Sequence, residues 1–285
     1  MSGSLVTHSG HTKLAGVIGW PVSHSLSPRI HGFWLKELGI DGAYVPFPVK
    51  PGAVEDAITG LVALGIAGAN VTVPHKEAVI PVMDELDQTA RRLGAVNTIV
   101  IDPGGRLIGR NSDGYGFLEN LYANAPDWSA KLGPATVLGA GGAARALVGA
   151  LLDAGAPEIR LVNRTRSRAE SIAEDFGDKR VIAGDWTAMA AHLESATLLV
   201  NTTSLGMKGQ PPLEIDLSSL PSDAVVNDIV YVPLETELLR SAKARGNVVV
   251  DGIGMLLHQA RLGFTAWFGG EPLVTDALRN FVLGS

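Results

Sequence analysis

Two segments of the chain carry residue types that catalysis uses. The first is NVTVPHK, residues 70–76, in which Lys76 follows Pro74 just past a short β-branched run. A lysine at the rim of a core either extends its ammonium to water or, when burial and neighbours tune its pKa, serves as a general acid or base. Asp113, in the segment RNSDG, is a candidate carboxylate to orient that amine. Periodicity alone does not establish that the two side chains meet.

The second segment is the glycine-rich stretch VLGAGGAARA, residues 137–146, in which Gly139, Gly141 and Ala144 fit the pattern G-x-G-x-x-G/A. Between a strand and a helix this spacing is typical of a dinucleotide site. Gly139 permits the tight turn, Gly141 lets a pyrophosphate approach the backbone, and Ala144 keeps the helix close to the sheet. The N-terminus of the helix then offers N–H groups and partial positive charge to the phosphates. Glycine turns are often only turns, so the prediction depends on the flanking strand and helix.

The end of the next predicted strand, IRLVN, indicates which dinucleotide binds. NAD sites usually carry an acidic residue there to accept from the ribose 2′-hydroxyl. Here the strand ends in Asn163-Arg164-Thr165, with Arg166 and Arg168 close behind. Guanidinium groups pair bidentately with phosphates, so the segment favours NADP over NAD. These arginines could instead be a solvated helix start, but cations there oppose the helix dipole.

Small polar side chains gather at predicted strand ends in the first half of the chain. Hydroxyls, amides, one amine and one carboxylate suit a small polyhydroxylated acid, whose hydroxyls need both donors and acceptors. The set comprises Ser23, Ser25, Ser27, Asn70, Thr72, Lys76, Asn97, Asn111, Ser112 and Asp113, with Gln259 from the tail. Structural roles stay open for Ser27 as a helix N-cap, Asn97 as a turn amide and Asp113 as a helix cap. The histidines His24, His31 and His75 have no metal-ligand spacing with carboxylates, so we interpret them as surface or core residues and expect no metal.

An α/β fold must position these residues. In the first half we expect strands at 14–19, 43–49 and 69–73, a hairpin from 95–102 and 106–109, and helices at 28–39 and 51–65. The two prolines in 43–49 predict an edge strand. In the second half we expect strands at 135–139, 159–163, 180–183, 197–201, 224–230 and 247–251, with helices at 142–154, 166–176, 186–193 and 235–245. Apolar strands that alternate with helices indicate a parallel sheet covered on both faces, and two further helices fill the tail.

The bulk composition narrows the class of protein. A chain of 285 residues exceeds one core, so two domains are expected. With 46% hydrophobic residues the chain is not disordered, and a net charge of −6 without a Lys/Arg block argues against nucleic acid or an anionic membrane as partner. The absence of cysteine excludes disulfides, thiolate metal sites and a cysteine nucleophile. No apolar run approaches the roughly 18 residues of a membrane span, and the start is typical of a flexible tail, residues 1–12, without a signal peptide. We therefore expect a cytoplasmic protein.

Taken together, the motifs resemble the shikimate dehydrogenase family. The matching segments are GWPVSHSLSPRIHG, GANVTVPHK, LGAVNTIV, GRNSDGYG, LGAGGAARA, VNRTRSRAE, NTTSLGM, NDIVYVPLET and DGIGMLLHQARLGF. They occur in family order and cover nearly the whole chain. The resemblance implies reversible, NADPH-dependent reduction of 3-dehydroshikimate to shikimate in aromatic amino-acid biosynthesis. It also implies a substrate domain (1–112 with 252–285, the C-terminal helices packing back on it) and a Rossmann domain (113–251) that binds NADP. We expect a monomer or a homodimer.

The resemblance also assigns roles to residues. Lys76 would be the acid/base residue with Asp113 hydrogen-bonded beside it, and Ser25 and Ser27 would bind the substrate carboxylate. The rest of the substrate pocket would be Asn70, Thr72, Asn97, Asp113, Tyr231 and Gln259. The cofactor would contact Gly139, Ala140, Gly141, Gly142, Ala143, Asn163, Arg164, Thr165 and Arg168, with Ile229, Gly252 and Met255 near the nicotinamide. Two departures are conservative: Ser112 replaces the usual threonine, and Ile229 stands where methionine is frequent.

Three other functions compete with this one. A quinate or mixed quinate/shikimate dehydrogenase would typically use NAD, whereas Ser25 and the Asn163-Arg164-Thr165 strand end favour shikimate and NADP. A sensor that kept the fold but lost the chemistry would have a damaged Lys76/Asp113 pair, and every matched position is intact. Another two-domain NADP dehydrogenase would share the glycine turn but not S-x-S-P or NVTVPHK.

Overall fold

The structure is a computed structural model that describes residues 8–284, and its chain forms two compact units. One unit contains the described residues up to Ser112 and those from Gln259 on, and the other is Asp113–His258. The sequence places the return to the first domain at Gly252, whereas the units divide between His258 and Gln259. That point lies inside α9 (Ile253–Phe268), a continuous helix in which no loop marks a boundary.

The first unit is built on a mixed sheet, which has six strands in the described part of the chain, in the order β2-β1-β3-β5-β6-β4. The strands are β1 (Lys13–Gly19), β2 (Gly42–Pro48), β3 (Gly68–Val71), β4 (Glu85–Leu86), β5 (Thr98–Ile101) and β6 (Leu107–Arg110). β1 runs parallel to β2 and β3, and β5 runs antiparallel to β3 and β6. The predicted hairpin is thereby confirmed as β5–β6, and the proline-bearing β2 is an edge strand, as expected.

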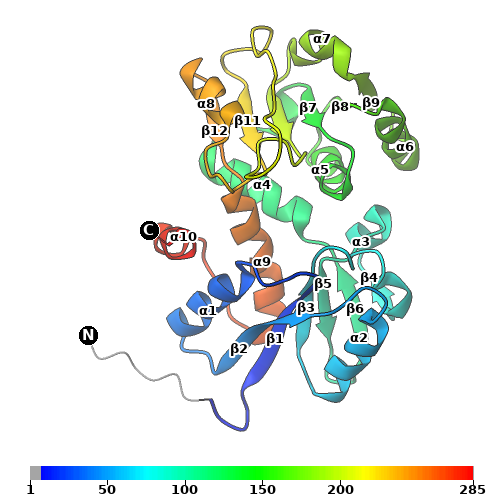
Figure 1. Ribbon diagram of the computed structural model, residues 1–285, viewed down its shortest axis with the longest axis vertical. Coiled ribbons are helices and arrows are strands. Elements are labelled where there is room, and N and C mark those ends of the chain that lie inside the picture. Colours follow the sequence, from blue (N-terminus) through cyan, green and yellow to red (C-terminus); the bar gives the residue numbers. More distant parts are fainter. Residues whose placement is uncertain (1–7, 285) are drawn as a thin grey trace. The chain divides into compact units, whose positions relative to one another are not determined.

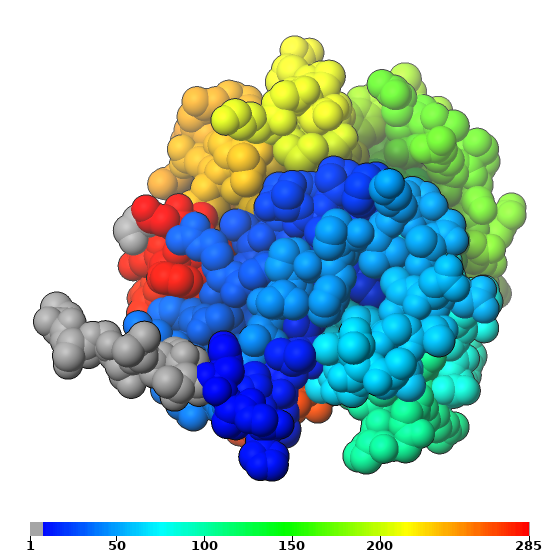
Figure 2. Space-filling model, turned by 60° about the horizontal axis from the view of Figure 1, so that its bottom comes forward, coloured from blue at the N-terminus to red at the C-terminus, as the bar shows by residue number. Residues whose placement is uncertain are grey.

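Each face of this sheet packs against different helices (Figure 1). On one face, Ile18, Val71 and Ile99 form an aliphatic core with Ile58 and Leu61 of α2 (Val54–Ala63). On the other face lie α1 (Ser27–Glu37) and the C-terminal part of α9, whose aromatic rings pack together. The last helix, α10 (Asp276–Leu283), packs on α1, so the C-terminal helices return to the first unit as predicted. Figure 2 shows one side of this unit, a surface made largely by the blue and cyan segments from the first part of the chain.

The second unit is built on a parallel sheet. In the described residues it has six strands in the order β12-β11-β10-β7-β8-β9. They are β7 (Ala135–Leu138), β8 (Ile159–Asn163), β9 (Val181–Asp185), β10 (Leu198–Asn201), β11 (Val225–Asp228) and β12 (Val248–Val250). All neighbouring pairs are parallel. Counted from β7, this is the 3-2-1-4-5-6 order of a Rossmann sheet, whose switch point lies between β7 and β10. The predicted parallel sheet is confirmed.

The helices of the second unit alternate with these strands (Figure 1). They are α4 (Asp113–Asn124), α5 (Gly142–Asp153), α6 (Arg166–Phe176), α7 (Met189–Leu193) and α8 (Glu237–Ala244). On one face of the sheet, Leu199 and Val226 pack with Leu193 of α7 and Leu238 of α8. α5 packs against α4 and against β7 and β8. Because the strands are parallel, their carboxyl ends lie at the same edge of the sheet, and the turns that leave these ends lie there together.

Some local predictions are wrong. α3 (Gln88–Leu93), capped by Asp87, and the two-residue β4 occupy a stretch for which the sequence predicted no element. The segment 186–193 is a short 3₁₀ turn, Trp186–Ala188, followed by α7 instead of one helix. The predicted flexible tail, residues 1–12, lies mostly outside the described residues. Of the helices that the structure describes, none is both long enough and apolar enough to cross a membrane.

Candidate active site

The predicted substrate residues of the first unit lie around the carboxyl ends of β1 and β3. Thr72, just past β3, donates its backbone N–H to Ile18 of β1 (2.9 Å), so the two strand ends are tied together. The NVTVPHK turn then runs back along the segment before β5, because the Lys76 carbonyl accepts from the Val96 N–H (2.8 Å). Lys76 is half-buried. The residue is neither fully exposed to water nor fully enclosed in the core, and this partial exposure suits a group that exchanges protons.

Side-chain hydrogen bonds cross the sheet from β2 to β5. The Tyr44 hydroxyl donates to Asn70 Oδ1 (2.7 Å), and Asn70 Nδ2 donates to the Asn97 carbonyl and to Thr98 Oγ1 (both 3.2 Å). Thr98 Oγ1 in turn donates to Asn97 Oδ1 (2.9 Å). Both amide hydrogens of Asn70 are therefore used inside the protein. What Asn70 can still offer a ligand is acceptor capacity on Oδ1.

Asn97 connects this series of hydrogen bonds to two more segments of the protein. Its Oδ1 accepts from the Ser112 N–H (2.9 Å), and its Nδ2 donates to Ser112 Oγ (3.1 Å) and to Gln259 Oε1 of α9 (3.2 Å). Asn97 is 3% exposed, so a lost partner here would leave a polar group buried. The structure thus brings together Asn70, Asn97 and Gln259, three of the predicted substrate residues. Asp113 follows Ser112 directly and begins the second unit.

The two predicted carboxylate-binding serines lie where α1 begins. Ser25 Oγ accepts from the Ser27 N–H (3.3 Å). Ser27 does not cap the helix: α1 starts at Ser27 itself, its N-cap is Leu26, and no side chain caps the terminus. The Ser27 hydroxyl instead meets the Tyr44 side chain, whose pKa is raised well above its usual value by burial, an effect that this hydroxyl partly offsets. The first N–H groups of α1 are donated to Ser25 Oγ and to the Leu26 carbonyl, so the groups that this end of the helix can offer an anion are the two serine hydroxyls.

Behind these residues, His31 and Tyr44 form a buried stack that the sequence analysis assigned no function. Their ring centroids are 3.9 Å apart with an interplanar angle of 7°. His31 is fully buried, and burial lowers its pKa to about 3, so the ring is neutral in the folded protein. Neither ring nitrogen has a hydrogen bond of normal geometry, and the nearby Asn70 amide offsets only part of the burial. The sequence feature that indicates this stack is Tyr44, whose side chain carries the one hydroxyl in the otherwise apolar edge strand β2.

In the second unit, the glycine turn lies at the switch point of the sheet. Gly139 follows β7 with φ +109°, and a Cβ there would be 2.6 Å from Thr202 Oγ1 beyond β10. Only glycine fits this position. Gly141 is the N-cap of α5 and Gly142 its first residue, and a Cβ on either would meet no atom within 4 Å. Ala144 is fully buried. Gly141 and Gly142 thus leave open space over the N-terminus of α5, a 12-residue helix with no side-chain cap. This space fits a pyrophosphate.

The neighbouring strand end supplies cations. Asn163 and Arg164 line a cavity of about 500 Å³ together with the loop residues Thr203, Ser204 and Leu205. Asn163 Nδ2 donates to the Thr165 carbonyl (2.8 Å), which shapes this turn. Arg166 is paired with Glu170 (2.9 Å), one turn later in α6.

The other two arginines of this segment differ from Arg166. Among residues 8–284, the guanidinium groups of Arg164 and Arg168 have no hydrogen bond or ion pair. Arg164, which lines the cavity, and Arg168, in the first turn of α6, are cations that fit the 2′-phosphate of NADP. The residues present therefore fit this cofactor.

The predicted nicotinamide residues lie at the far part of the same edge. A Cβ on Gly252 would be 2.3 Å from the Ile229 carbonyl oxygen, so these two backbones touch. Tyr231 follows in the same loop and is half-buried, and burial raises its pKa. Met255 is half-buried two residues into α9. Asp228, which no motif in the sequence indicated, ends β11 fully buried. Burial raises its pKa to about 6.

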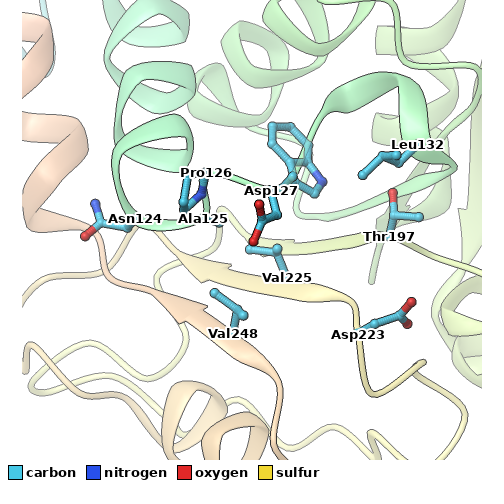
Figure 3. Close-up of a pocket in the computed structure, with 10 residues that line it drawn as sticks. Asn124, Ala125, Pro126, Asp127, Leu132, Thr197, Asp223, Val225 and Val248 are labelled. Atoms are coloured by element: carbon cyan, nitrogen blue, oxygen red, sulfur yellow. The ribbon is translucent and has the colours of Figure 1, made fainter.

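Further cavities include one that lies away from these groups and one beside the network around Asn97. One of about 370 Å³, at the opposite edge of the parallel sheet, is lined by Thr197, Val225 and Val248, residues at or before the starts of β10, β11 and β12 (Figure 3). None of the predicted site residues lines it. The other, about 510 Å³ in the first unit, is bordered by Thr98 and Ser112. Within the described residues no cluster of three or more histidine or acidic side chains could hold a metal ion.

Comparison with protein families gives two matches along the chain. Residues 17–99 match the family described as shikimate dehydrogenase substrate binding domain, and residues 126–207 match shikimate / quinate 5-dehydrogenase. The first match contains the serines and the NVTVPHK turn, and the second contains the glycine turn and the arginines.

Individual relatives span almost the full length. The chain is 61% identical over 275 residues to the shikimate dehydrogenase (NADP(+)) of Paramagnetospirillum magneticum, covering 96% of this chain and 99% of the relative. Among solved structures, shikimate 5-dehydrogenase from Thermus thermophilus in complex with NADP(H) and shikimate is 37% identical with a TM-score of 0.84, covering 96% and 99% of the two chains. Quinate dehydrogenase from Corynebacterium glutamicum in complex with NAD is 33% identical with a TM-score of 0.88 and the same coverage.

Proposed function

The chain belongs to the shikimate dehydrogenase family, and we propose that it catalyses the reversible NADPH-dependent reduction of 3-dehydroshikimate to shikimate, a step of aromatic amino-acid biosynthesis. The observation that carries this proposal is the joined network of Asn70, Asn97 and Gln259, found in a chain 61% identical to a shikimate dehydrogenase (NADP(+)). The first unit is the substrate domain and the second is the NADP domain.

The proposed substrate residues come mainly from the first unit, with Asp113 and Tyr231 from the second. Ser25 and Ser27 hold the carboxylate of the acid through their hydroxyl groups at the start of α1. Asn97 and Gln259, together with Thr72, Asp113 and Tyr231, face its hydroxyl groups. Asn70 accepts from a substrate hydroxyl, because its own amide hydrogens are already donated to Asn97 and Thr98.

Lys76 transfers the proton of the reaction, and Asp113 assists it. When NADPH is bound, it supplies a hydride to the carbonyl carbon of 3-dehydroshikimate. The Lys76 ammonium gives its proton to the carbonyl oxygen, which becomes the new hydroxyl, and in the reverse direction the neutral amine takes that proton back. Asp113 orients the Lys76 amine toward the carbonyl oxygen.

The second unit holds the cofactor through three groups. Gly139 to Ala143 and the N-terminus of α5 receive the pyrophosphate. Asn163, Thr165, Arg164 and Arg168 receive the ribose 2′-phosphate. Ile229, Gly252 and Met255 border the nicotinamide. We also propose that the enzyme works in the cytoplasm, in keeping with its cysteine-free sequence, and as a monomer or a homodimer.

The assay that tests the proposal follows absorbance of the reduced nicotinamide with shikimate or quinate, each with NADP or NAD. We expect shikimate with NADP to give the highest kcat/KM. A quinate dehydrogenase has the same fold at a TM-score of 0.88, so the fold does not decide between the two acids. Turnover of quinate equal to that of shikimate would overturn the substrate assignment, and a preference for NAD would overturn the cofactor assignment.

A further inference from the structure

Asp228 is a buried carboxylate with no part in the reaction described above. It ends β11 at 0% exposure and accepts three hydrogen bonds. Its Oδ1 accepts from Asn201 Nδ2 and from the Val230 N–H (both 3.0 Å), and its Oδ2 accepts from Thr236 Oγ1 (2.7 Å). The three donors come from the ends of two neighbouring strands and from the start of α8.

Asn201 extends this cluster to the adjacent loop. Its Nδ2 donates to the Leu205 carbonyl (3.2 Å) as well as to Asp228, and its Oδ1 accepts from the Thr203 N–H (3.0 Å) and Oγ1 (2.7 Å). All four hydrogen-bonding positions of the amide are thereby used. Asn201 is 0% exposed, so no water competes for them.

The cluster fixes two loops at the carboxyl edge of the sheet. One is the loop from Ile229 to Thr236, which carries Ile229 and Tyr231 and is held at both ends by Asp228. The other runs from Asn201 to Leu205 and lines the cavity beside Arg164. A single carboxylate thus connects the segment proposed to contact the substrate and the nicotinamide with the segment that lines the cavity beside Arg164.

The chemistry of a carboxylate explains why an acid is buried here. Taking a carboxylate out of water is costly, and burial raises the pKa of Asp228. An apolar side chain would avoid that cost but leave three donors without an acceptor, and an amide would offer them one acceptor oxygen where the carboxylate offers two. What the carboxylate adds is acceptor-only chemistry: it accepts from all three donors at once and fixes their directions.

We propose that Asp228 is a positioning residue of the dehydrogenase, whose carboxylate holds the Ile229–Thr236 and Asn201–Leu205 loops in the geometry that binds NADP and presents Tyr231 to the substrate. The inference rests on the proposed function. Asp228 touches neither ligand in this scheme and acts through the loops.

Asp228→Asn and Thr236→Val test the proposal. Asparagine has one acceptor oxygen for the three donors, and valine removes the Thr236 donor. Both variants therefore weaken the hydrogen bonds that connect Asp228 to the two loops. We expect kcat/KM for shikimate to fall by about tenfold or more in each, and NADPH to bind more weakly in a fluorescence titration. Thr236→Ser retains the hydroxyl and should restore values near those of the wild type.

Thr275→Val is the matched control. Thr275 and Thr236 both cap eight-residue helices that carry an acidic first turn, through the N–H groups of Leu278 (3.2 Å) and Leu239 (3.4 Å). Only Thr236 also donates to Asp228. Both valine variants should lower the melting temperature, but Thr275→Val should keep wild-type kinetics.

The outcomes separate this inference from the proposed function. Wild-type enzyme inactive on shikimate would reject the proposed function, and NADPH affinity of the variants would still decide the role of Asp228. Asp228→Asn and Thr236→Val with unchanged kinetic constants and unchanged NADPH affinity, and only a lower melting temperature, would overturn the positioning role.

Discussion

Replacing His31 with phenylalanine should make the first unit less sensitive to acid. Burial lowers the pKa of His31 to about 3, whereas an unfolded histidine titrates near 6.5. Between these values the unfolded chain binds a proton that the folded chain does not. The contribution of neutral His31 to stability is therefore complete above pH 6.5 and is lost as the pH falls through 6.5 toward 3.

The size of the effect follows from these two pKa values. At pH 5 an unfolded histidine is about 97% protonated and the buried ring about 1%. The free energy of unfolding should then fall by about 2 kcal/mol between pH 7.5 and pH 5 through this residue, and by about 5 kcal/mol over the whole range. Phenylalanine keeps the ring that stacks on Tyr44 and has no proton to gain, so the variant should lack this slope.

Urea unfolding of wild type and His31→Phe at pH 7.5 and pH 5 measures the slope. Hydrogen exchange of peptides from α1 and β2 assigns the transition to the first unit. The quantity to compare is the difference between the two proteins in how the free energy of unfolding changes with pH. Asp228 is present in both and changes this free energy with the opposite sign, so the difference cancels its effect. Its pKa is raised to about 6, so its contribution grows as the pH falls through 6. Equal pH dependence in the two proteins, within about 0.5 kcal/mol, would refute the assignment of a neutral, buried His31.

Three further variants, one of them a double substitution, test the proposed site. Lys76→Ala should lower kcat by orders of magnitude with unchanged folding, and a rise in KM alone would make Lys76 a binding residue. Arg164→Ala with Arg168→Ala should weaken NADP far more than NAD in paired titrations, and equal losses would reject the 2′-phosphate assignment. Gly139→Ala should cost several kcal/mol and abolish NADP binding, because φ is +109° and the new Cβ would lie 2.6 Å from Thr202 Oγ1. Wild-type melting and affinity in that variant would contradict the strained turn.

The periodic elements of the fold were predictable because their signals are local. β8 and α6 occupy the predicted residues 159–163 and 166–176. Apolar β-branched runs and glycine turns determine such elements without reference to the rest of the chain. The element missed before β5, α3, is six residues long with two arginines in its last turn, and it depends on the Asp87 cap and on packing of Ala90 and Leu93.

The candidate site was predictable where a motif specifies chemistry and not where contacts create it. The glycine turn needs Gly139 for its backbone geometry, and that need is visible in the spacing. The network around Asn97 depends on sheet register, which places Thr98 beside Asn70 across β3 and β5. Asp228 had a signal that was not used: one acid within the apolar run AVVNDIV, where an unpaired charge would not be tolerated.

The edge strand β2 has a consequence for how copies of this protein associate. Val49 donates its backbone N–H to the Gly19 carbonyl of β1. Along β2 the backbone N–H groups alternate between β1 and solvent, so positions 46 and 48, both prolines, are positions whose N–H would point to solvent. Proline has no N–H, and a strand approaching from solvent would find two donors missing from the row it must pair with. We expect this rim to resist sheet extension and aggregation, and any homodimer to form without a continuous sheet through β2.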